Sequence, residues 1–204
     1  MPSRADYERA TIDAILDEAI VSHLGTVGPD GAPLVVPTLH ARQGDHVYIH
    51  GSAASPTLHR AGKAELCLTA SIVDGLVLAR SAVHHSVNYR SVVVFGQAER
   101  LDASEDKLRA LEAFTEKLVP GRWADVRPPT EQELKGTGVL RLSLEEASAK
   151  VRSGGPLDDE PDYELPVWAG TVGLRLTTTA TRPDERLLPG VECPEYVREL
   201  TREA

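Results

Sequence analysis

The sequence "HHSVNYRS", residues 84–91, gathers polar side chains directly before the apolar run "VVVF". In an extended strand Asn88 and Arg90 face one way, whereas Tyr89 and Ser91 face the other. The planar fork of Arg90 suits a phosphate or a carbonyl edge. Ser86, Asn88 and Ser91 offer polar groups to a ligand, and Tyr89 offers a ring for packing. We therefore predict a ligand-binding strand; an edge or interface strand whose polar groups pair with one another is the alternative.

A second candidate is "YIHGSAAS", residues 48–55. Gly51 allows close approach of a backbone to a ligand, and Ser52 and Ser55 supply hydroxyl donors. A short helix that begins after Ser55 presents its first amides to an anion. This pattern predicts a phosphate cradle, and a plain Gly-Ser turn before a capped helix is the alternative. The nearest cations in the sequence are Arg60 and Lys63.

Of the seven histidines only His46 and His50 are four residues apart, and they lie in a strand pattern and not on a helix, so we predict no metal site. One histidine beside a ligand is a candidate proton donor, and His50 and His85 are our choices. The chain has no G-x-S-x-G elbow, Walker-type loop, C-x-x-C or G-x-G-x-x-G motif. Cys67 lies inside an apolar strand pattern, where we expect a core thiol and not a nucleophile.

Short strands and turns position these residues. The turn "PDGA" joins two strands into a hairpin, and "DG" at 74–75 predicts a second hairpin. Amphipathic helices are expected over 4–19, capped by Ser3, and over 102–118, where Leu108, Leu111 and Leu118 form one face. Strands therefore dominate residues 20–100, and helices lie at the periphery. The pattern predicts a mainly β fold, a small barrel with peripheral helices.

Composition limits the class of protein. The 204 residues predict a single domain with a core over about 20–175 and a C-terminal tail over 176–204. The net charge of −9 argues against nucleic acid as a partner. No run of about 20 apolar residues is present to cross a membrane. The charged N-terminal stretch lacks the apolar core of a signal peptide, so we expect a cytoplasmic protein.

The motifs "PDGAP", "LVVPTLHA", "HVYIHGSAAS" and "HHSVNYRSVVVFGQAERL" occur in an order that resembles a known family. They are similar to the split β-barrel of flavin-nucleotide-binding proteins related to pyridoxamine 5′-phosphate oxidase. The nitroimidazole-resistance reductase branch is the most similar, and "SAKVRSG" and "LDDEPDYELPVWAG" extend the likeness across roughly residues 10–175. The resemblance implies FMN as cofactor and a homodimer that holds the flavin at the subunit interface.

The resemblance also implies roles for particular residues. Backbone groups around Val36, Pro37 and Thr38 would contact the flavin ring, and Arg152 and Trp168 would join the pocket near the partner subunit. The alternatives are that Trp168 is a core residue and that Arg152 is a solvated side chain. In the oxidase relatives the cradle loop carries basic residues, whereas here Pro56 and Thr57 follow Ser55. Dedicated vitamin B6 oxidation is therefore not expected.

The resulting expectation is a flavin-dependent oxidoreductase of unknown substrate that transfers hydride or electrons at the flavin. Its partner would be a small-molecule substrate or an electron donor such as NAD(P)H. Two alternatives remain open. One is a flavin-binding carrier without turnover, and the other is a haem-binding or haem-degrading relative with His50, His84 and His85 as first candidate ligands. Some relatives use a deazaflavin. Fold alone does not choose among these activities.

Overall fold

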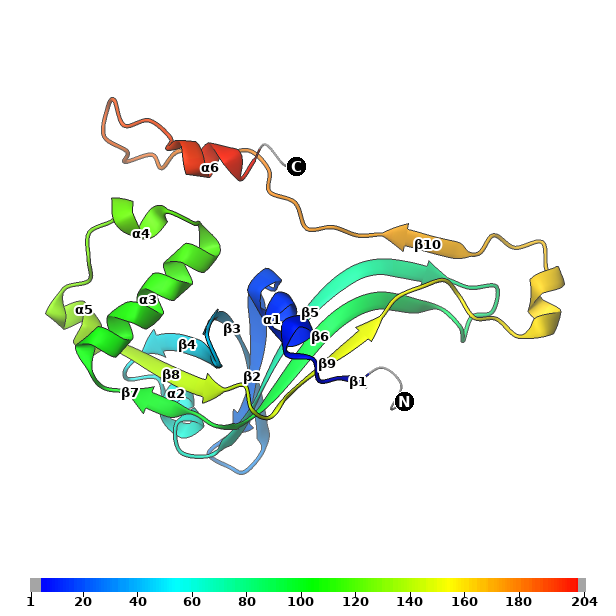
Figure 1. The fold of residues 1–204 in the computed structure, drawn as a ribbon, viewed down its shortest axis with the longest axis horizontal. Helices are drawn as coiled ribbons and strands as arrows, with labels where there is room; N and C mark the ends of the chain where they lie inside the picture. Colours follow the sequence, from blue (N-terminus) through cyan, green and yellow to red (C-terminus); the bar gives the residue numbers. More distant parts are fainter. Residues whose placement is uncertain (1–4, 202–204) are drawn as a thin grey trace.

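The computed structural model describes residues 5–201, and its main element is one curled antiparallel sheet (Figure 1). The strand order is β1-β9-β6-β5-β2-β3-β4-β8-β7, and β10 pairs with the far half of β5. This architecture confirms the predicted mainly β split barrel with peripheral helices. The strands are β1 (Ala5–Asp6), β2 (Val21–Val27), β3 (Pro33–Gln43), β4 (His46–Ser52), β5 (Glu65–Leu78), β6 (Ser86–Gln97), β7 (Glu99–Leu101), β8 (Thr137–Ser143), β9 (Ala147–Arg152) and β10 (Gly170–Gly173).

Short helices surround the sheet. The expected helix over 4–19 begins only at Arg9, because residues 5–6 form β1 and pair with β9. The proposed cap Ser3 lies outside the described residues. The helices are α1 (Arg9–Glu18), α2 (Pro56–Ala61), α3 (Ser104–Leu118), α4 (Arg122–Asp125), α5 (Glu131–Gly136), α6 (Glu195–Glu199) and the 3-10 helix η2 (Glu160–Glu164).

Alternation along the strands builds the core on the inner face of the sheet. In β2, Ser22, Leu24 and Thr26 are buried and the residues between them are more exposed. β5 and β6 follow the same rule, and α1 covers their inner side chains, because successive side chains in a strand point to opposite faces. The principal members of this core are Ile12, Ile15, Leu16, Leu24, Leu66, Leu68, Ala70, Val92, Val94, Leu140 and Leu142.

Strand β3 joins the two halves of the sheet. Its residues 33–39 pair with β2, and its residues 40–43 pair with β4. The second half packs under α3 in a smaller core that contains Ala41, Tyr48 and Phe114. Helix α3 is where the sequence predicted it, but its buried face runs through Lys107, Ala110 and Phe114, and Leu118 is 47% exposed. The predicted leucine face is therefore wrong in part.

The hairpin predicted at Asp74–Gly75 is absent. β5 continues through both residues to Leu78 as a β-bulge opposite β6, and the chain reverses between residues 79 and 85. Two contacts explain the difference. The Asp74 carboxylate accepts hydrogen bonds from Arg90, and Gly75 lies so close to β10 that a Cβ there would be 2.8 Å from the Val172 carbonyl oxygen. Gly75 therefore serves close strand packing and not a turn.

The outer face of the sheet lacks a cover within the described chain. Its apolar side chains include Val27, Val35, Val73 and Phe95, of which Phe95 is 55% exposed. Every residue from 171, within β10, to 192 is exposed. The chain then crosses back to α6 (Figure 1), whose Tyr196 hydroxyl donates to Asp125 at the end of α4. No helix within residues 5–201 combines the length and apolar character needed to cross a bilayer.

A buried polar contact lies between α1, β3 and α3. His40 is fully buried, and its Nε2 lies 2.8 Å from Lys117 Nζ and 2.8 Å from the Leu16 carbonyl oxygen. Lys117 Nζ also donates to that oxygen at 2.6 Å. Burial, reinforced by the Lys117 charge, lowers the pKa of His40 from 6.5 to about 4. Burial lowers the pKa of Lys117 to about 8. The fold therefore holds His40 neutral.

This contact predicts a loss of stability in acid. The folded pKa of His40 lies below its unfolded value, so the unfolded chain takes up the proton first as the pH falls from 6.5 to 4. The free energy of unfolding should drop over this range by up to about 3 kcal/mol from His40 alone. Urea denaturation at pH 7 and pH 4.5 measures the drop. It should be smaller in His40→Gln than in the wild type or a His46→Gln control, and an equal drop in all three would contradict the assignment.

Candidate functional site

The predicted phosphate cradle is a tight loop between β4 and α2. Ser55 caps α2 by accepting a hydrogen bond from the Leu58 amide at 3.4 Å, and the Ala54 amide donates to the Ser52 hydroxyl at 3.2 Å. A Cβ on Gly51 would lie 2.9 Å from Leu58 Cδ1. Glycine at 51 therefore lets α2 pack against β4. The serine hydroxyls accept local hydrogen bonds, as in the alternative of a Gly-Ser turn before a capped helix.

A pocket of about 320 Å³ lies beside this loop. It is lined by Ala53 of the loop, by Leu58, His59, Gly62 and Lys63 of α2 and the residues after it, and by Arg100 of β7. Lys63 and Arg100 bring positive charge to one side of the cradle from sequence positions far apart. Arg60, the other cation near in sequence, does not line this pocket, and its Nε is buried without a hydrogen-bond partner. The pocket is suited to an anionic group.

The second group of candidates joins β6 to β9. Arg152 Nη1 donates to the Asn88 side-chain oxygen at 2.5 Å, and the Asn88 amide nitrogen donates to the Gly154 carbonyl oxygen at 3.1 Å. Tyr89 lies opposite Arg152 in the strand register, and Lys150 Nζ lies 5.9 Å from the centre of the Tyr89 ring. The Ser91 hydroxyl donates to the Lys150 carbonyl oxygen. Several polar groups of this strand thus pair with neighbours, as the alternative interpretation expected.

Arg90 lies on the inner face and holds three elements together. Its guanidinium donates to both oxygens of Asp74 on β5 and to both oxygens of Glu18 on α1, at 2.5–2.9 Å. These hydrogen bonds lower the pKa of both carboxyl groups. The guanidinium meets carboxylates within its own chain, so its geometry here is that of a structural tie between α1, β5 and β6. Its predicted contact with the cofactor stays a prediction.

The remaining candidates lie apart from these groups. Pro37 is exposed on the outer face, and Val36 and Thr38 face inward beside it on β3. Trp168 is 67% exposed and its ring lies over Gly170, at the start of β10. Ser86 begins β6 and is half-buried. Among residues 5–201 the hydrogen bonds join candidates within the groups on β4 and β6 but do not link one group to the other.

The candidate proton donors differ in environment. His50 is half-buried and packs edge-on against Phe114, with ring centres 4.4 Å apart, and burial lowers the pKa of its imidazole. It is therefore neutral at neutral pH and donates only as a neutral N–H. His85 is exposed, and its Nδ1 lies 3.0 Å from the Ser81 carbonyl oxygen. Burial raises the pKa of Cys67, which keeps the thiol protonated, as expected for a residue that is not a nucleophile.

Comparison with known proteins defines the class of this chain. Residues 8–151 match the family model described as pyridoxamine 5′-phosphate oxidase, and the chain belongs to this family. The flavocytochrome Anf3 from Azotobacter vinelandii has a similar structure, with a TM-score of 0.92 and 42% identity over 97% of this chain and 92% of that one. The FAD- and haem-binding protein from Mycobacterium smegmatis also superposes with a TM-score of 0.92, at 33% identity over 97% of each chain.

A third structure shares the fold alone. It is a putative 5-nitroimidazole antibiotic resistance protein from Bacteroides thetaiotaomicron, with a TM-score of 0.60 and 21% identity over 72% of this chain and 86% of that one. No match was found among curated proteins. The resemblance seen in the sequence is therefore confirmed at the level of family and fold.

Sequence reasoning missed two residues that matter to the geometry. Arg100 reaches the pocket beside the cradle from β7, and its only signal was a basic residue at the end of a predicted strand. Asp158 has a fully buried side chain and accepts from the Arg80 and Ser81 amides and from the Arg80 guanidinium. An acidic run such as 158–164 is typical of a solvated loop, yet the side chain of Asp158 is buried. Neither contact is local in sequence.

The tie through Arg90 predicts a structural effect of mutation. Arg90→Gln leaves Glu18 and Asp74 facing each other, and we expect the free energy of unfolding to fall by about 1–2 kcal/mol, because all three side chains are partly solvated. Arg109→Gln, which removes an exposed pair with Asp106 on α3, is the control and should change little. Chemical denaturation measures both. Restoration of stability by adding Asp74→Asn to Arg90→Gln would support the tie; full stability of Arg90→Gln alone would refute it.

Proposed function

We propose that this protein binds a flavin nucleotide between two copies of the chain and acts as a flavin-dependent oxidoreductase. The observation that carries the proposal is the loop 52–55 with Lys63 and Arg100 at the adjoining pocket, in a chain of the pyridoxamine 5′-phosphate oxidase family. The similar structures whose names include a flavin or a flavocytochrome support the cofactor class. The substrate and the electron donor are not part of the proposal.

Different residues of the chain would bind the phosphate and the ring of the flavin nucleotide. The loop 52–55 and the cations Lys63 and Arg100 suit the phosphate end of the nucleotide. Val36, Pro37 and Thr38 on β3 and Tyr89 on β6 remain our candidates for the ring, as the family resemblance implies. A flavin supplies hydride and one-electron chemistry at its ring, and the protein supplies binding, orientation and exclusion of water. His50, neutral in its half-buried place, is a candidate to hold a proton near the ring.

The form of the flavin is a separate part of the proposal. The sequence resemblance favours FMN, and the M. smegmatis relative at 33% identity is named as an FAD-binding protein. Both nucleotides carry the same phosphate next to the ribityl chain, which the loop 52–55 would hold in either case. We propose FMN as the minimal ligand, and analysis of the released nucleotide tests FMN against FAD.

The phosphate assignment predicts a difference between FMN and riboflavin. Lys63→Gln and Arg100→Gln should each weaken FMN binding by about tenfold, because each removes one charge-assisted contact of roughly 1.4 kcal/mol. Riboflavin lacks the phosphate, so its affinity should change little. Fluorescence titration of the stripped protein measures both affinities, with Lys135→Gln on α5 as an exposed control.

Ser52→Ala is a further variant for the same titration, because Ser55 also caps α2 and its loss would disturb the helix. Equal losses for FMN and riboflavin in the Lys63 and Arg100 variants would assign these residues to folding and not to the phosphate. FMN binding that stays at the wild-type level would remove the pocket from the site.

The second copy in the proposal would cover the outer face of the sheet. Val27, Val35 and Phe95 line a shallow apolar hollow of about 330 Å³ on that face. The segment 171–192 carries exposed leucines, of which Leu176 is 83% exposed. A lone chain gains little by ordering such a segment, since the cost in conformational entropy needs buried contacts to offset it. Contact with a second copy would bury both surfaces.

A charge on the outer face should therefore separate the two copies. Phe95→Asp places a carboxylate on the proposed interface, and we expect it to convert a dimer into monomers in sedimentation at micromolar concentration. Leu118→Asp on α3, at a similarly exposed apolar position off this face, should leave the dimer intact. A wild-type protein that sediments as a monomer, or a Phe95→Asp variant that stays dimeric, would contradict the proposed interface.

Haem binding is the second candidate function, and one observation favours it. Both structures that match with a TM-score of 0.92 are named for it, one as a flavocytochrome and one as an FAD- and haem-binding protein. The candidate ligands lie in two places, with His50 on β4 and His84 and His85 in the loop between β5 and β6. A haem would accompany the flavin in this alternative, and its Soret band is separate from flavin absorption.

A further inference from the structure

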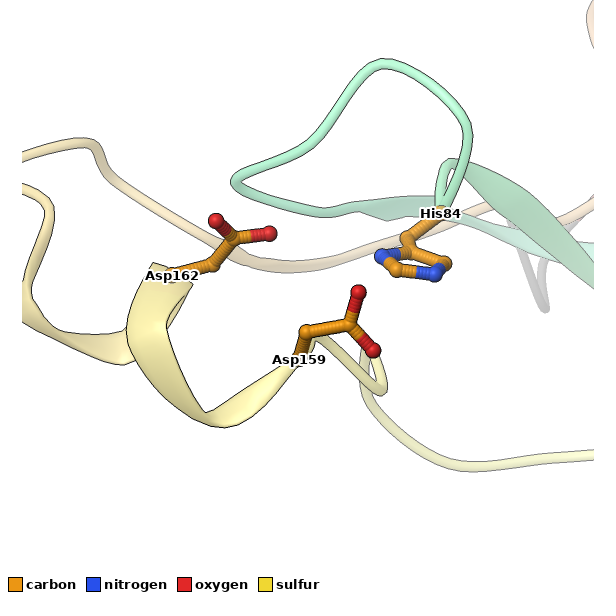
Figure 2. Close-up of side chains that lie close together, drawn as sticks. All are labelled: His84, Asp159 and Asp162. Atoms are coloured by element: carbon orange, nitrogen blue, oxygen red, sulfur yellow. The ribbon is translucent and has the colours of Figure 1, made fainter.

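We propose that His84, Asp159 and Asp162 form a divalent cation site, suited to Zn²⁺, that fastens η2 to the loop between β5 and β6. One ligand atom from each of the three side chains lies within 4.8 Å of the other two. Figure 2 shows a ring nitrogen of His84 turned toward the gap between the two carboxylates, of which Asp159 directly precedes η2 and Asp162 lies within it. The histidine and the carboxylates are far apart in sequence, so local spacing could not indicate this site.

The imidazole has an unused buried nitrogen. Nδ1 of His84 is buried and makes no hydrogen bond, and the nearest oxygen of Asp158 is 3.8 Å away. A buried polar atom without a partner costs free energy, and a metal ion beside it would supply the missing interaction. Asp158 itself is committed elsewhere, because its carboxylate accepts from the Arg80 and Ser81 amides and the Arg80 guanidinium. It anchors the loop and leaves Asp159 and Asp162 as ligands.

The anchor keeps both sides of the site in place. Arg80 pairs with Asp158 and its guanidinium also lies 4.9 Å from the centre of the Tyr163 ring, so these contacts join the loop to η2. Asp159 is exposed and Asp162 is half-buried, which leaves access from solvent. An ion can therefore enter without unfolding of the chain. Its binding would fix η2 in place, and Trp168 and β10 follow η2 in the sequence.

The donor set selects the class of ion. One imidazole nitrogen and two carboxylate oxygens suit Zn²⁺ with a fourth position open to water, whereas Mg²⁺ and Ca²⁺ prefer oxygen alone. With Zn–N and Zn–O bonds of about 2.1 Å, tetrahedral ligand atoms lie about 3.4 Å apart. The three side chains must close from at most 4.8 Å, a shift that rotation of partly exposed side chains provides.

The test measures Zn²⁺ binding by calorimetry and by metal analysis after dialysis, on the protein as purified and then treated with EDTA. We expect one equivalent per chain, and at least tenfold weaker binding in His84→Gln, Asp159→Asn and Asp162→Asn. The matched controls are His85→Gln and Glu160→Gln, which alter a neighbouring histidine and a neighbouring carboxylate outside the cluster. Both should bind Zn²⁺ as tightly as the wild type does. Circular dichroism establishes that each variant is folded. Weakened Zn²⁺ binding in any one folded ligand variant suffices to support the site.

Three results would overturn the proposal. The first is the absence of Zn²⁺ binding above the dialysis buffer, and the second is binding that survives all folded ligand variants. The third is loss of a Soret band in His84→Gln with Zn²⁺ binding unchanged, which would identify His84 as a haem ligand. Flavin content is measured in the same samples, so a failure of the flavin proposal is seen separately from a failure of this one.

Discussion

The alternation of side chains along the curled sheet is the constraint on which the rest of the structure depends. Because successive residues of a strand face opposite sides, filling the inner face with Leu24, Leu68 and Val94 fixes which residues face outward. Those outward residues include Val35 and Phe95, which no other part of the described chain covers. One strand pattern thus produces both the core and the surface that we propose for contact with a second copy.

The same constraint separates residues that are neighbours in sequence. Arg90 faces inward and ties α1 to β5 through Glu18 and Asp74, whereas Tyr89 faces outward with Lys150 near its ring. The polar cluster before "VVVF" therefore serves two purposes. Arg90 on the inner face stabilises the fold, and the outward-facing residues remain candidates for ligand and partner contacts. The ion pairs of Arg90 with Glu18 and Asp74 explain in part why polar residues precede the apolar run of β6.

Sequence predicted the elements whose signals are local. The "PDGA" turn lies between β2 and β3 as expected, and Gly62 ends α2. It failed where a tertiary contact decided the outcome, since Asp74–Gly75 matches a hairpin turn but is held in a bulge by Arg90 and by the approach of β10. In the site, the loop 52–55 was predictable from its two serines and from Gly51 directly before it. The cation Arg100 was not, because only the closure of the sheet brings β7 beside α2.

Flavin binding is tested by the visible absorption spectrum of the purified protein, together with identification of the chromophore released on denaturation. We expect a yellow protein that releases a flavin nucleotide carrying at least one phosphate, with or without an added Soret band. A colourless protein that takes up neither FMN nor FAD when these are offered would contradict it. Release of haem alone, without flavin, would also contradict it and would leave the split barrel as a haem protein.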